Sequence, residues 1–308
     1  MANYHVPVLV NETVKYLINN IDGVYVDCTA GTGGHIEAIS QHLSKNAVII
    51  AIDGDEQSLD ICKNRFKNMN NIIYANDNFK NIKKIIFTNG YTKLDGILVD
   101  LGLSNFLLNS SGRGFTYKKD EPLDMRFITS QKYTARSFLN NAPFEELKSE
   151  LKKYSEDRYA AKIAREIIKE RATQPIETTG QLVSIIKRVA PEPFLTKTLS
   201  RIFQAIRIHV NKEMENLQAL LEQSISILNP GGRIVIISYH SIEDRIVKNF
   251  FKTESTDCIC PDNFPICTCN HKKTIKILTR KHITPGKNEI EKNPNARSAK
   301  LRAAERLN

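Results

Sequence analysis

The sequence predicts a doubly wound α/β sheet that is interrupted by a helical insertion. Three observations support this fold class. Short apolar runs alternate with helical stretches up to about residue 101, this pattern stops near residue 105, and it resumes near residue 215. We therefore expect a discontinuous domain formed by residues 1–105 and 215–308, with residues 106–214 as the insertion.

Four short apolar runs in the first part of the chain are typical of buried parallel strands. They occupy residues 24–28, 47–53, 72–76 and 95–101, and helical stretches at 35–43 and 57–68 follow the first two. The first run ends at a glycine-rich turn, and the second ends in an acid. Strands and helices that alternate in this order predict parallel pairing.

Residues 106–214 lack such runs and instead show helical periodicity. Apolar side chains recur on one helical face of residues 160–168, and Thr178 with Gln181 forms a capping-box pattern before another helix. The α/β pattern then returns as an amphipathic helix over 217–228, a turn at 229–232 and a strand at 234–238. A last helix over 241–251 begins at Ser241, which we expect to cap it.

Composition and charge indicate a folded protein with a polyanionic partner. The 308 residues are 41% hydrophobic and 25% charged, which excludes global disorder, and the formal net charge is +10. Residues 112–214 hold 20 basic and 13 acidic side chains, and residues 271–308 hold 11 and 3. Such segregation favours nucleic-acid binding, with solvated helix faces as the alternative.

No stretch of the sequence has the length of a membrane span. The longest apolar runs, such as residues 47–52, fall far short of the roughly 18 to 20 residues that cross a bilayer. A basic segment followed by an apolar leader does not open the chain. We expect a cytoplasmic protein without a membrane partner.

The glycine-rich turn after the first strand is the candidate cofactor site. Asp27 ends the strand, and Gly31, Gly33 and Gly34 follow it in a turn where a ligand can approach the backbone. Asp53 ends the second strand about 20 residues after the turn, where a carboxylate can accept both ribose hydroxyls of an adenosine. Position 36 is isoleucine and not the third glycine of a dinucleotide fingerprint. The pattern favours S-adenosylmethionine, and an NAD-dependent enzyme is the alternative.

Further candidates belong to the same edge of the predicted sheet. Phe79 follows the third strand, where it can cover an adenine, and Asp100 ends the fourth. Ser238 ends the fifth strand, and Tyr239 and His240 follow it. Methylation of an exocyclic nitrogen needs a proton acceptor, because the nitrogen lone pair is delocalised into the ring. Asp100 is therefore the catalytic candidate, and Ser238, Tyr239 and His240 are candidates for substrate binding.

Four of the six cysteines lie close together near the C-terminus. They are Cys258, Cys260, Cys267 and Cys269, with His271 nearby. Closely spaced thiols can close a tetrahedral zinc site, although pairs separated by a single residue depart from the usual spacing. A structural zinc site and reduced loop thiols both remain open. The spacing favours thiols, so we assign no metal ligand.

Seven sequence blocks together resemble the ribosomal RNA small subunit methyltransferase H family. The resemblance runs from residue 5 to the last few residues and so covers essentially the whole chain. The blocks are 5–9 (His-Val-Pro-Val-Leu), 33–35 (Gly-Gly-His), 100–102 (Asp-Leu-Gly), 113–115 (Arg-Gly-Phe) with 122–126 (Pro-Leu-Asp-Met-Arg), 202–207 (Ile-Phe-Gln-Ala-Ile-Arg), 238–245 (Ser-Tyr-His-Ser-Ile-Glu-Asp-Arg) and 298–302 (Ser-Ala-Lys-Leu-Arg).

The resemblance implies an S-adenosylmethionine-dependent enzyme that methylates the exocyclic N4 of one cytidine in the decoding region of 16S ribosomal RNA. It implies a Rossmann-like class I methyltransferase sheet interrupted by a helical substrate-recognition domain. The implied partner is 16S ribosomal RNA or the small ribosomal subunit. The family's cofactor contacts carry over onto Gly33, Gly34, His35, Asp53, Phe79 and Asp100.

Candidate RNA contacts lie in the two basic regions. Arg113, Lys118 and Lys119 beside Phe115 and Tyr117 are placed to meet phosphates and a stacked base. The basic tail over residues 272–306 is a second candidate, with a solvated appendage as its alternative. A noncatalytic RNA-binding ribosome assembly factor is the alternative function.

One position departs from the family pattern. After residues 100–104 the family usually continues Ser-Pro-Gln, whereas here the glutamine position of the cofactor site is Leu107. A leucine side chain cannot form a hydrogen bond. We expect altered donor affinity with activity retained, and tighter binding in Leu107→Gln.

Overall fold

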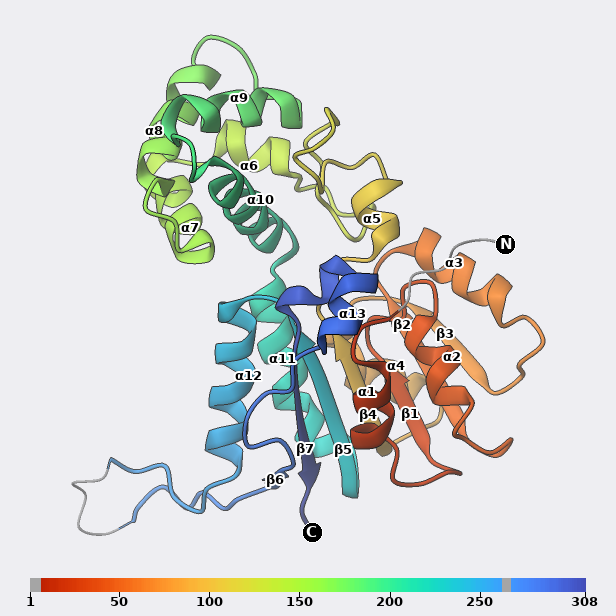
Figure 1. Cartoon of the computed structure of the whole chain (residues 1–308). Coiled ribbons are helices and arrows are strands. Elements are labelled where there is room, and N and C mark those ends of the chain that lie inside the picture. The colour runs from red at the N-terminus through yellow and green to blue at the C-terminus, as the bar shows by residue number, and fades with distance from the viewer. Residues whose placement is uncertain (1–6, 262–266) are drawn as a thin grey trace. The chain divides into compact units, whose positions relative to one another are not determined.

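The computed structural model describes residues 7–261 and 267–308, which divide into two compact units (Figure 1). The first unit is Met1–Gly102 with Glu215–Asn308, and the second is Leu103–Met214. His5 and Val6 of the first sequence block lie outside the described residues. The chain leaves the first unit just after its fourth strand and re-enters it within a helix.

The first unit is built on a seven-stranded sheet in the order β3-β2-β1-β4-β5-β7-β6. The chain winds outward from β1 to β3 and then continues on the other side of β1, so the topological switch point lies between β1 and β4. The predicted Rossmann-like fold is thereby confirmed. The strands are β1 (Val24–Asp27), β2 (Val48–Asp53), β3 (Ile72–Asn76), β4 (Leu94–Asp100), β5 (Leu228–Ser238), β6 (Ile275–Ile277) and β7 (Lys300–Arg306).

The C-terminal tail is part of this sheet and is not a solvated appendage. Strand β7 pairs antiparallel with β5 on one side and with β6 on the other, and Leu301, Ala303 and Ala304 are buried. The appendage alternative is therefore wrong for this strand. The predicted turn at 229–232 is also corrected, because β5 already pairs with β4 at Leu228 and these residues form an irregularity within the strand.

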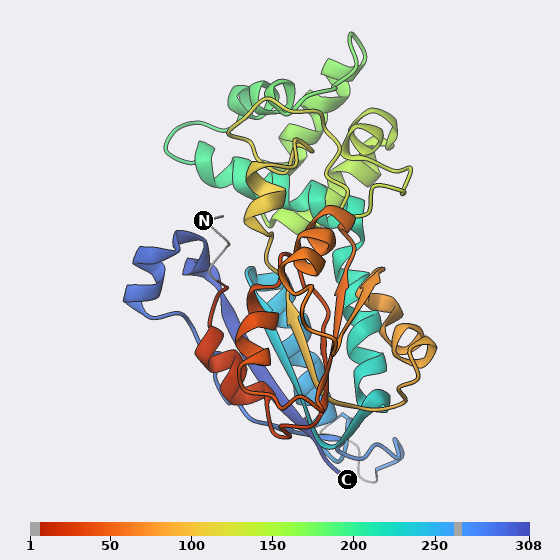
Figure 2. The same ribbon diagram turned by 90° about the vertical axis from the view of Figure 1, so that its right-hand side faces the viewer.

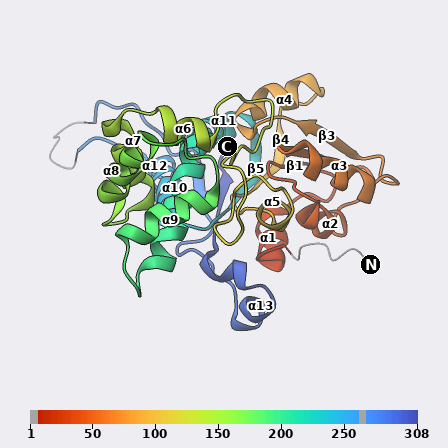
Figure 3. The ribbon, with the colours of Figure 1, turned by 90° about the horizontal axis from the view of Figure 1, so that it is seen from above.

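Helices cover both faces of the sheet, as Figure 3 shows. One face carries α1 (Val10–Leu17), α2 (Gly34–Ser40) and α3 (Glu56–Arg65), and the other carries α4 (Ile82–Thr88), α11 (Glu213–Ile227) and α12 (Ser241–Glu254). Smaller elements are η1 (Phe79–Asn81), α13 (Lys287–Lys292) and η2 (Pro294–Ser298).

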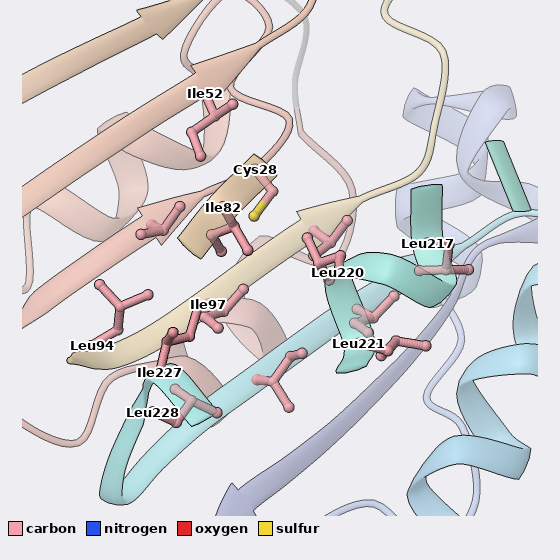
Figure 4. Close-up of a cluster of buried hydrophobic side chains, with 14 of the residues drawn as sticks. Cys28, Ile52, Ile82, Leu94, Ile97, Leu217, Leu220, Leu221, Ile227 and Leu228 are labelled. Carbon is pink, nitrogen blue, oxygen red and sulfur yellow. The ribbon is translucent and has the colours of Figure 1, made fainter. Parts of the chain in front are cut away.

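The apolar side of α11 illustrates how the core forms. Leu217, Leu220 and Leu221 recur at helical spacing, are at most 1% exposed and belong to one core cluster with the sheet residues Leu94 and Ile97 (Figure 4). Each such side chain contributes about 1.5–3 kcal/mol relative to its exposed state. The predicted amphipathic helix in this region is confirmed.

The second unit is helical in its described elements (Figure 2). The Thr178–Gln181 capping box at the start of α9 is confirmed, and Ile163 and Ile167 of α8 are buried as their periodicity predicts. None of the described helices of either unit is long and apolar enough to span a membrane. The helices are α5 (Asn105–Asn109), α6 (Ala135–Asn141), α7 (Phe144–Ser155), α8 (Ala160–Arg171), α9 (Thr179–Val189) and α10 (Leu195–Asn211).

Candidate active site

Polar residues end the five parallel strands of the sheet. In the order of the sheet they are Asn76, Asp53, Asp27, Asp100 and Ser238, at the ends of β3, β2, β1, β4 and β5. Parallel strands bring their carboxyl ends to one edge, so three carboxylates converge beside the switch point. This edge is where open α/β sheets bind ligands.

The glycine-rich turn is tied to this edge by hydrogen bonds. The Gly31 N–H donates to Asp53 Oδ2 at 2.7 Å, and the Thr29 N–H donates to Asp27 Oδ1 at 3.0 Å. Thr29 Oγ1 in turn accepts the Asp100 N–H at 2.7 Å. The turn therefore fixes the ends of β1, β2 and β4 relative to one another.

The glycines of the turn serve different purposes. Gly31 has a φ of +51° and open space where a side chain would stand, since a Cβ would meet no atom closer than 3.9 Å. Gly33 has a φ of +86°, and a Cβ there would lie 2.3 Å from the Phe66 ring. At Gly34 a Cβ would lie 3.2 Å from the Pro7 ring. Gly31 leaves room for a ligand, whereas Gly33 and Gly34 allow close packing of α2.

Asp53 retains acceptor capacity for a ligand. Its Oδ2 accepts the Gly31 N–H, and its Oδ1 accepts the Asp55 N–H at 2.8 Å. A carboxylate offers about four lone-pair positions, so these two bonds leave one on each oxygen. Burial raises the pKa of Asp53 to about 6, despite the two N–H donors that favour the ionised form.

Asp27, His35 and Asp100 form a second buried polar group. His35 Nε2 lies 3.4 Å from Asp100 Oδ2, outside hydrogen-bond geometry, and neither ring nitrogen has a hydrogen-bond partner among the described residues. Asp27 Oδ2 also lacks such a partner within the described chain. Burial raises the pKa of Asp27 to about 6, although the nearby His35 opposes the shift. Buried polar atoms of this kind point to a missing ligand or water.

Asp100 and Tyr239 are brought together by the pairing of β4 with β5. The Tyr239 hydroxyl lies close to the Asp100 carboxylate, and burial together with the Asp100 charge raises the pKa of the phenol. The phenol therefore stays protonated beside Asp100. The Tyr239 ring lies against Gly102, where a Cβ would come within 2.7 Å of two ring atoms. Gly102 in turn donates its N–H to Asp100 Oδ1 at 3.0 Å.

The start of α12 holds the Tyr239 backbone in place. Glu243 is fully buried, and its Oε2 accepts the N–H groups of Tyr239 at 2.7 Å and His240 at 3.2 Å. The helix is capped by His240, whose ring accepts the Glu243 N–H, so the expected cap at Ser241 is wrong. Sequence reasoning missed Glu243 because a capping box normally begins with serine or threonine.

Ser238 and Phe79 are placed as parts of the framework. Ser238 is 2% exposed, and its hydroxyl donates to the Lys300 carbonyl of β7 at 3.3 Å. Phe79 opens η1 just after β3 and packs its half-buried ring against the core. A direct ligand contact by either side chain remains a prediction.

Arg113 is buried within the second unit. Its guanidinium donates to the carbonyls of Arg126 at 3.1 Å and Phe127 at 3.3 Å. The Phe115 ring is 6% exposed and stacks on the Phe127 ring at 5.5 Å, so it is not free to stack on a base. The sequence shows that Arg113 is charged, but it does not show that its side chain is buried. Lys118 and Lys119 are the exposed cations of the same loop.

Leu107 lies on α5 of the second unit. Its side chain is 9% exposed, and its backbone N–H donates to Ser104 Oγ at 3.2 Å. This hydrogen bond caps the helix through the backbone of Leu107. The side chain of Leu107 is apolar and has no polar function. The proposed effect of Leu107→Gln on donor affinity remains a prediction.

The two isolated cysteines are not nucleophiles. Burial raises the pKa of Cys28 well above its ordinary value and that of Cys62 to about 12. A cysteine attacks as the thiolate, which both residues therefore lack near neutral pH. Neither buried thiol is therefore set up for covalent catalysis.

The doubly wound sheet, the open turn at Gly31 and the carboxylate at Asp53 define an α/β enzyme that binds an adenosine-containing ligand. The model of the MraW methylase family matches residues 2–307, and this chain belongs to that family.

Two curated relatives match along nearly their whole length. Ribosomal RNA small subunit methyltransferase H of Caldicellulosiruptor saccharolyticus is 46% identical over 304 residues, covering 98% of this chain and 99% of that protein. The protein of the same name from Clostridioides difficile is 44% identical over 314 residues, covering 100% of both. Among solved structures, an rRNA methylase from Streptococcus thermophilus aligns with a TM-score of 0.42 at 12% identity, covering 97% of this chain and 94% of that one.

The chain is thus a methyltransferase whose cofactor is S-adenosylmethionine, and the NAD-dependent alternative is excluded. The residues at the carboxyl edge fit this cofactor. Asp53 has lone pairs left for two ribose hydroxyls, Gly31 leaves space above the turn, and His35 has unsatisfied ring nitrogens. Asp27 joins the candidate residues here, because its Oδ2 has no hydrogen-bond partner in the described chain and because His35 and Asp100 lie near it.

Proposed function

We propose that this enzyme methylates the exocyclic N4 of a cytidine in the decoding region of 16S ribosomal RNA. The observation that carries the proposal is the pairing of the Asp100 carboxylate with the nearby Tyr239 phenol at the carboxyl edge of the sheet. A pair of this kind supplies a proton acceptor and a donor that orients it. The relatives named for small-subunit ribosomal RNA support the substrate class.

The chemistry requires little of the protein beyond alignment and proton removal. The bound cofactor supplies a methyl group on a sulfonium sulfur, which needs no further activation. Asp53 holds the ribose, and the protein excludes water and positions the acceptor amine. Asp100 accepts one proton of that amine, while the Tyr239 hydroxyl keeps the carboxylate in place.

The state of the cysteines supports nitrogen over ring carbon as the acceptor. Methylation of carbon five of a pyrimidine requires a thiolate nucleophile. Cys28 stands at the turn, but its raised pKa keeps it a neutral thiol. An exocyclic amine needs no covalent intermediate, and a carboxylate acceptor is sufficient for it.

The second unit is proposed as the part that recognises the substrate. Residues 112–214 carry 20 basic against 13 acidic side chains, which suits a polyanion. In this proposal the exposed Lys118 and Lys119 contact phosphates, and Arg113 shapes the loop that presents them. The partner is the small ribosomal subunit or its RNA, which implies a cytoplasmic location.

The test is nucleoside mass spectrometry of ribosomal RNA after incubation with enzyme and a methyl-labelled cofactor. Naked 16S RNA and isolated small subunits serve as separate substrates. We expect one labelled N4-methylcytidine, mapped by nuclease protection to the decoding region. Asp100→Asn is expected to lower the transfer rate by about 10²–10⁴-fold with the cofactor still bound.

Three outcomes would contradict the proposal. Label on carbon five or on a ribose oxygen would refute the assigned acceptor atom. Label outside the decoding region would refute the site. The absence of label from both substrates, with bound cofactor verified by calorimetry, would refute ribosomal RNA as the substrate.

A further inference from the structure

Four cysteine sulfurs converge on one point in the loop between α12 and β6, at the lower left of Figure 1. This cysteine cluster consists of Cys258, Cys260, Cys267 and Cys269. All four sulfurs lie within 4.8 Å of one another. The Cys258 sulfur lies 3.4 Å from that of Cys267 and 3.9 Å from that of Cys269, and the last two are 3.5 Å apart.

These separations match a tetrahedral metal site. Zn–S bonds of about 2.3 Å place the sulfurs of a four-thiolate zinc site about 3.8 Å apart. All four cysteines are free. Two disulfides would collect the sulfurs into two separate pairs, whereas here three of the sulfurs lie at similar distances from one another. Mutual convergence of this kind indicates a central ion.

The local backbone explains how two cysteines that are separated by a single residue can bind the same metal ion. Each Cys-X-Cys segment bends at its second cysteine, at Cys260 and at Cys269, and brings both of its sulfurs to the shared point. The intervening Ile259 is 52% exposed, and Thr268 is also exposed. The usual spacing of two to four residues is therefore not needed when two such segments face each other.

Backbone N–H groups surround the sulfurs. The Ile259 N–H donates to Cys269 Sγ at 3.5 Å, and the Cys260 N–H donates to Cys258 Sγ at 3.4 Å. Cys269 also accepts the backbone N–H of His271. Such donors orient metal-bound thiolates and offset their charge. The His271 ring is engaged elsewhere, with Nε2 at 3.0 Å from the Thr253 carbonyl.

The loop has no hydrophobic core of its own in its described part. From Ser255 to Thr274, every described residue is exposed or only partly buried. The two ends of the loop are joined by a hydrogen bond, in which the Thr274 N–H donates to the Glu254 carbonyl at 2.7 Å. Small segments without a core are ordinarily ordered by a metal or by disulfides.

We propose that the cysteine cluster binds one structural Zn²⁺ ion that orders this loop. All four coordination positions are filled by thiolates, so none is open for water or substrate, as in structural sites. The site is separate from the catalytic edge, because α12 begins at that edge and its 14 residues span about 21 Å before the loop. The ion therefore has no part in methyl transfer.

The first test is the metal content of the full-length protein purified without chelator. We expect about one zinc per chain, lost in the double variant Cys258→Ser/Cys269→Ser and retained in the control Thr268→Ala. Cobalt added to the stripped wild-type protein is expected to give the absorption of a tetrahedral thiolate complex. The methyltransferase activity of both variants is expected to match the wild type and shows that they are folded.

A second measurement uses only the wild-type chain. Trypsin cleavage after Lys272 and Lys273 is expected to become about tenfold faster when a chelator removes the ion, and to slow again when zinc is returned. Zinc that persists in the double-serine variant would refute the assignment. So would four reactive thiols that fail to bind added zinc, disulfides in freshly purified protein, or iron in place of zinc.

Discussion

The Tyr239 hydroxyl lies close to the carboxylate of Asp100, and the two residues stand at the ends of neighbouring strands of the sheet. Two further contacts hold Tyr239 in this position. The Tyr239 ring packs on the bare Cα of Gly102, and its backbone N–H is held by the buried Glu243. The carboxylate is thus oriented by a phenol that is itself fixed at both ends, so the geometry is in place before the cofactor binds.

Removal of the phenol oxygen tests this relationship directly. Tyr239→Phe preserves the ring on Gly102 but removes the hydroxyl beside the Asp100 carboxylate. We expect kcat to fall by about 10–100-fold while the cofactor Kd changes less than about twofold. Single-turnover kinetics and calorimetry measure the two quantities separately. Loss of cofactor binding with an unchanged transfer rate would show that the pair serves the cofactor and not the acceptor.

The position of the ring is tested at Gly102. In Gly102→Ala the new Cβ would lie 2.7 Å from the Tyr239 ring, so the ring must move. We expect a loss of about 1–3 kcal/mol in the free energy of unfolding and a fall of about tenfold in kcat. The matched control is Gly286→Ala, where a Cβ meets no atom within 4 Å, with an expected change of about 0.5 kcal/mol or less. Equal effects in urea denaturation of the two variants would contradict this account.

The strand ends and the meeting of Asp100 with Tyr239 follow from sequence features that are local. Apolar runs end in polar residues, and the winding rule places their carboxyl ends at one edge. Strand β7 was missed because Lys300–Arg306 holds no β-branched residue, and its place depends on pairing with β5 and β6. The burial of Arg113 likewise depends on carbonyls of a distant part of its loop. Such tertiary contacts leave no periodic signal.

Cofactor affinity is expected to depend on pH through Asp53. Its pKa is raised to about 6 in the free protein, and two ribose hydroxyls donate more strongly to the ionised form than to the protonated one. Binding therefore favours the carboxylate, so affinity rises with pH up to about 6 and is flat above it. We expect the Kd to be about tenfold weaker at pH 5 than at pH 7, measured by calorimetry.

Asp53→Asn is the control for this pH dependence. The variant is expected to bind the cofactor about 100-fold more weakly at pH 7, because an amide supplies only one acceptor oxygen. Most of the pH dependence should disappear, and the remainder belongs to Asp27, whose pKa is also raised to about 6. A variant with the full wild-type pH profile would place the titrating group elsewhere.

The RNA-binding role of the second unit predicts a changed response to salt. The double variant Lys118→Glu/Lys119→Glu is expected to weaken RNA binding and to flatten the slope of log K against log salt by about 0.7 for each lost phosphate contact. Lys45→Glu/Lys67→Glu carries the same charge change on exposed positions of the first unit. Filter binding across a salt series measures both. Equal slopes in the two double variants would argue for a general charge effect and against a specific contact.

The missed strand β7 is anchored by an ion pair whose contribution can be measured. Arg302 Nε and Nη2 lie 2.7 and 3.2 Å from the two carboxylate oxygens of Asp244 on α12, and the side chains are 11% and 13% exposed. Burial opposes ionisation of Asp244, but Arg302 outweighs it and lowers the pKa of the carboxyl group. A lowered pKa stabilises the folded protein above the ordinary pKa of an aspartate, and this stability is lost as the pH falls.

Replacement of the arginine should therefore be costly near neutral pH and less so in acid. Arg302→Met leaves the buried Asp244 with the more distant Lys300 at 3.8 Å and with His282, and we expect a loss of about 3 kcal/mol at pH 7. At pH 3 the cost should shrink, because protonation of Asp244 removes the uncompensated charge. The double variant Asp244→Asn/Arg302→Met should recover part of the loss at pH 7, since no charge is then left buried. Urea denaturation at both pH values measures the loss in the free energy of unfolding. If this loss is the same at both pH values and is not relieved in the double variant, Arg302 acts through packing alone.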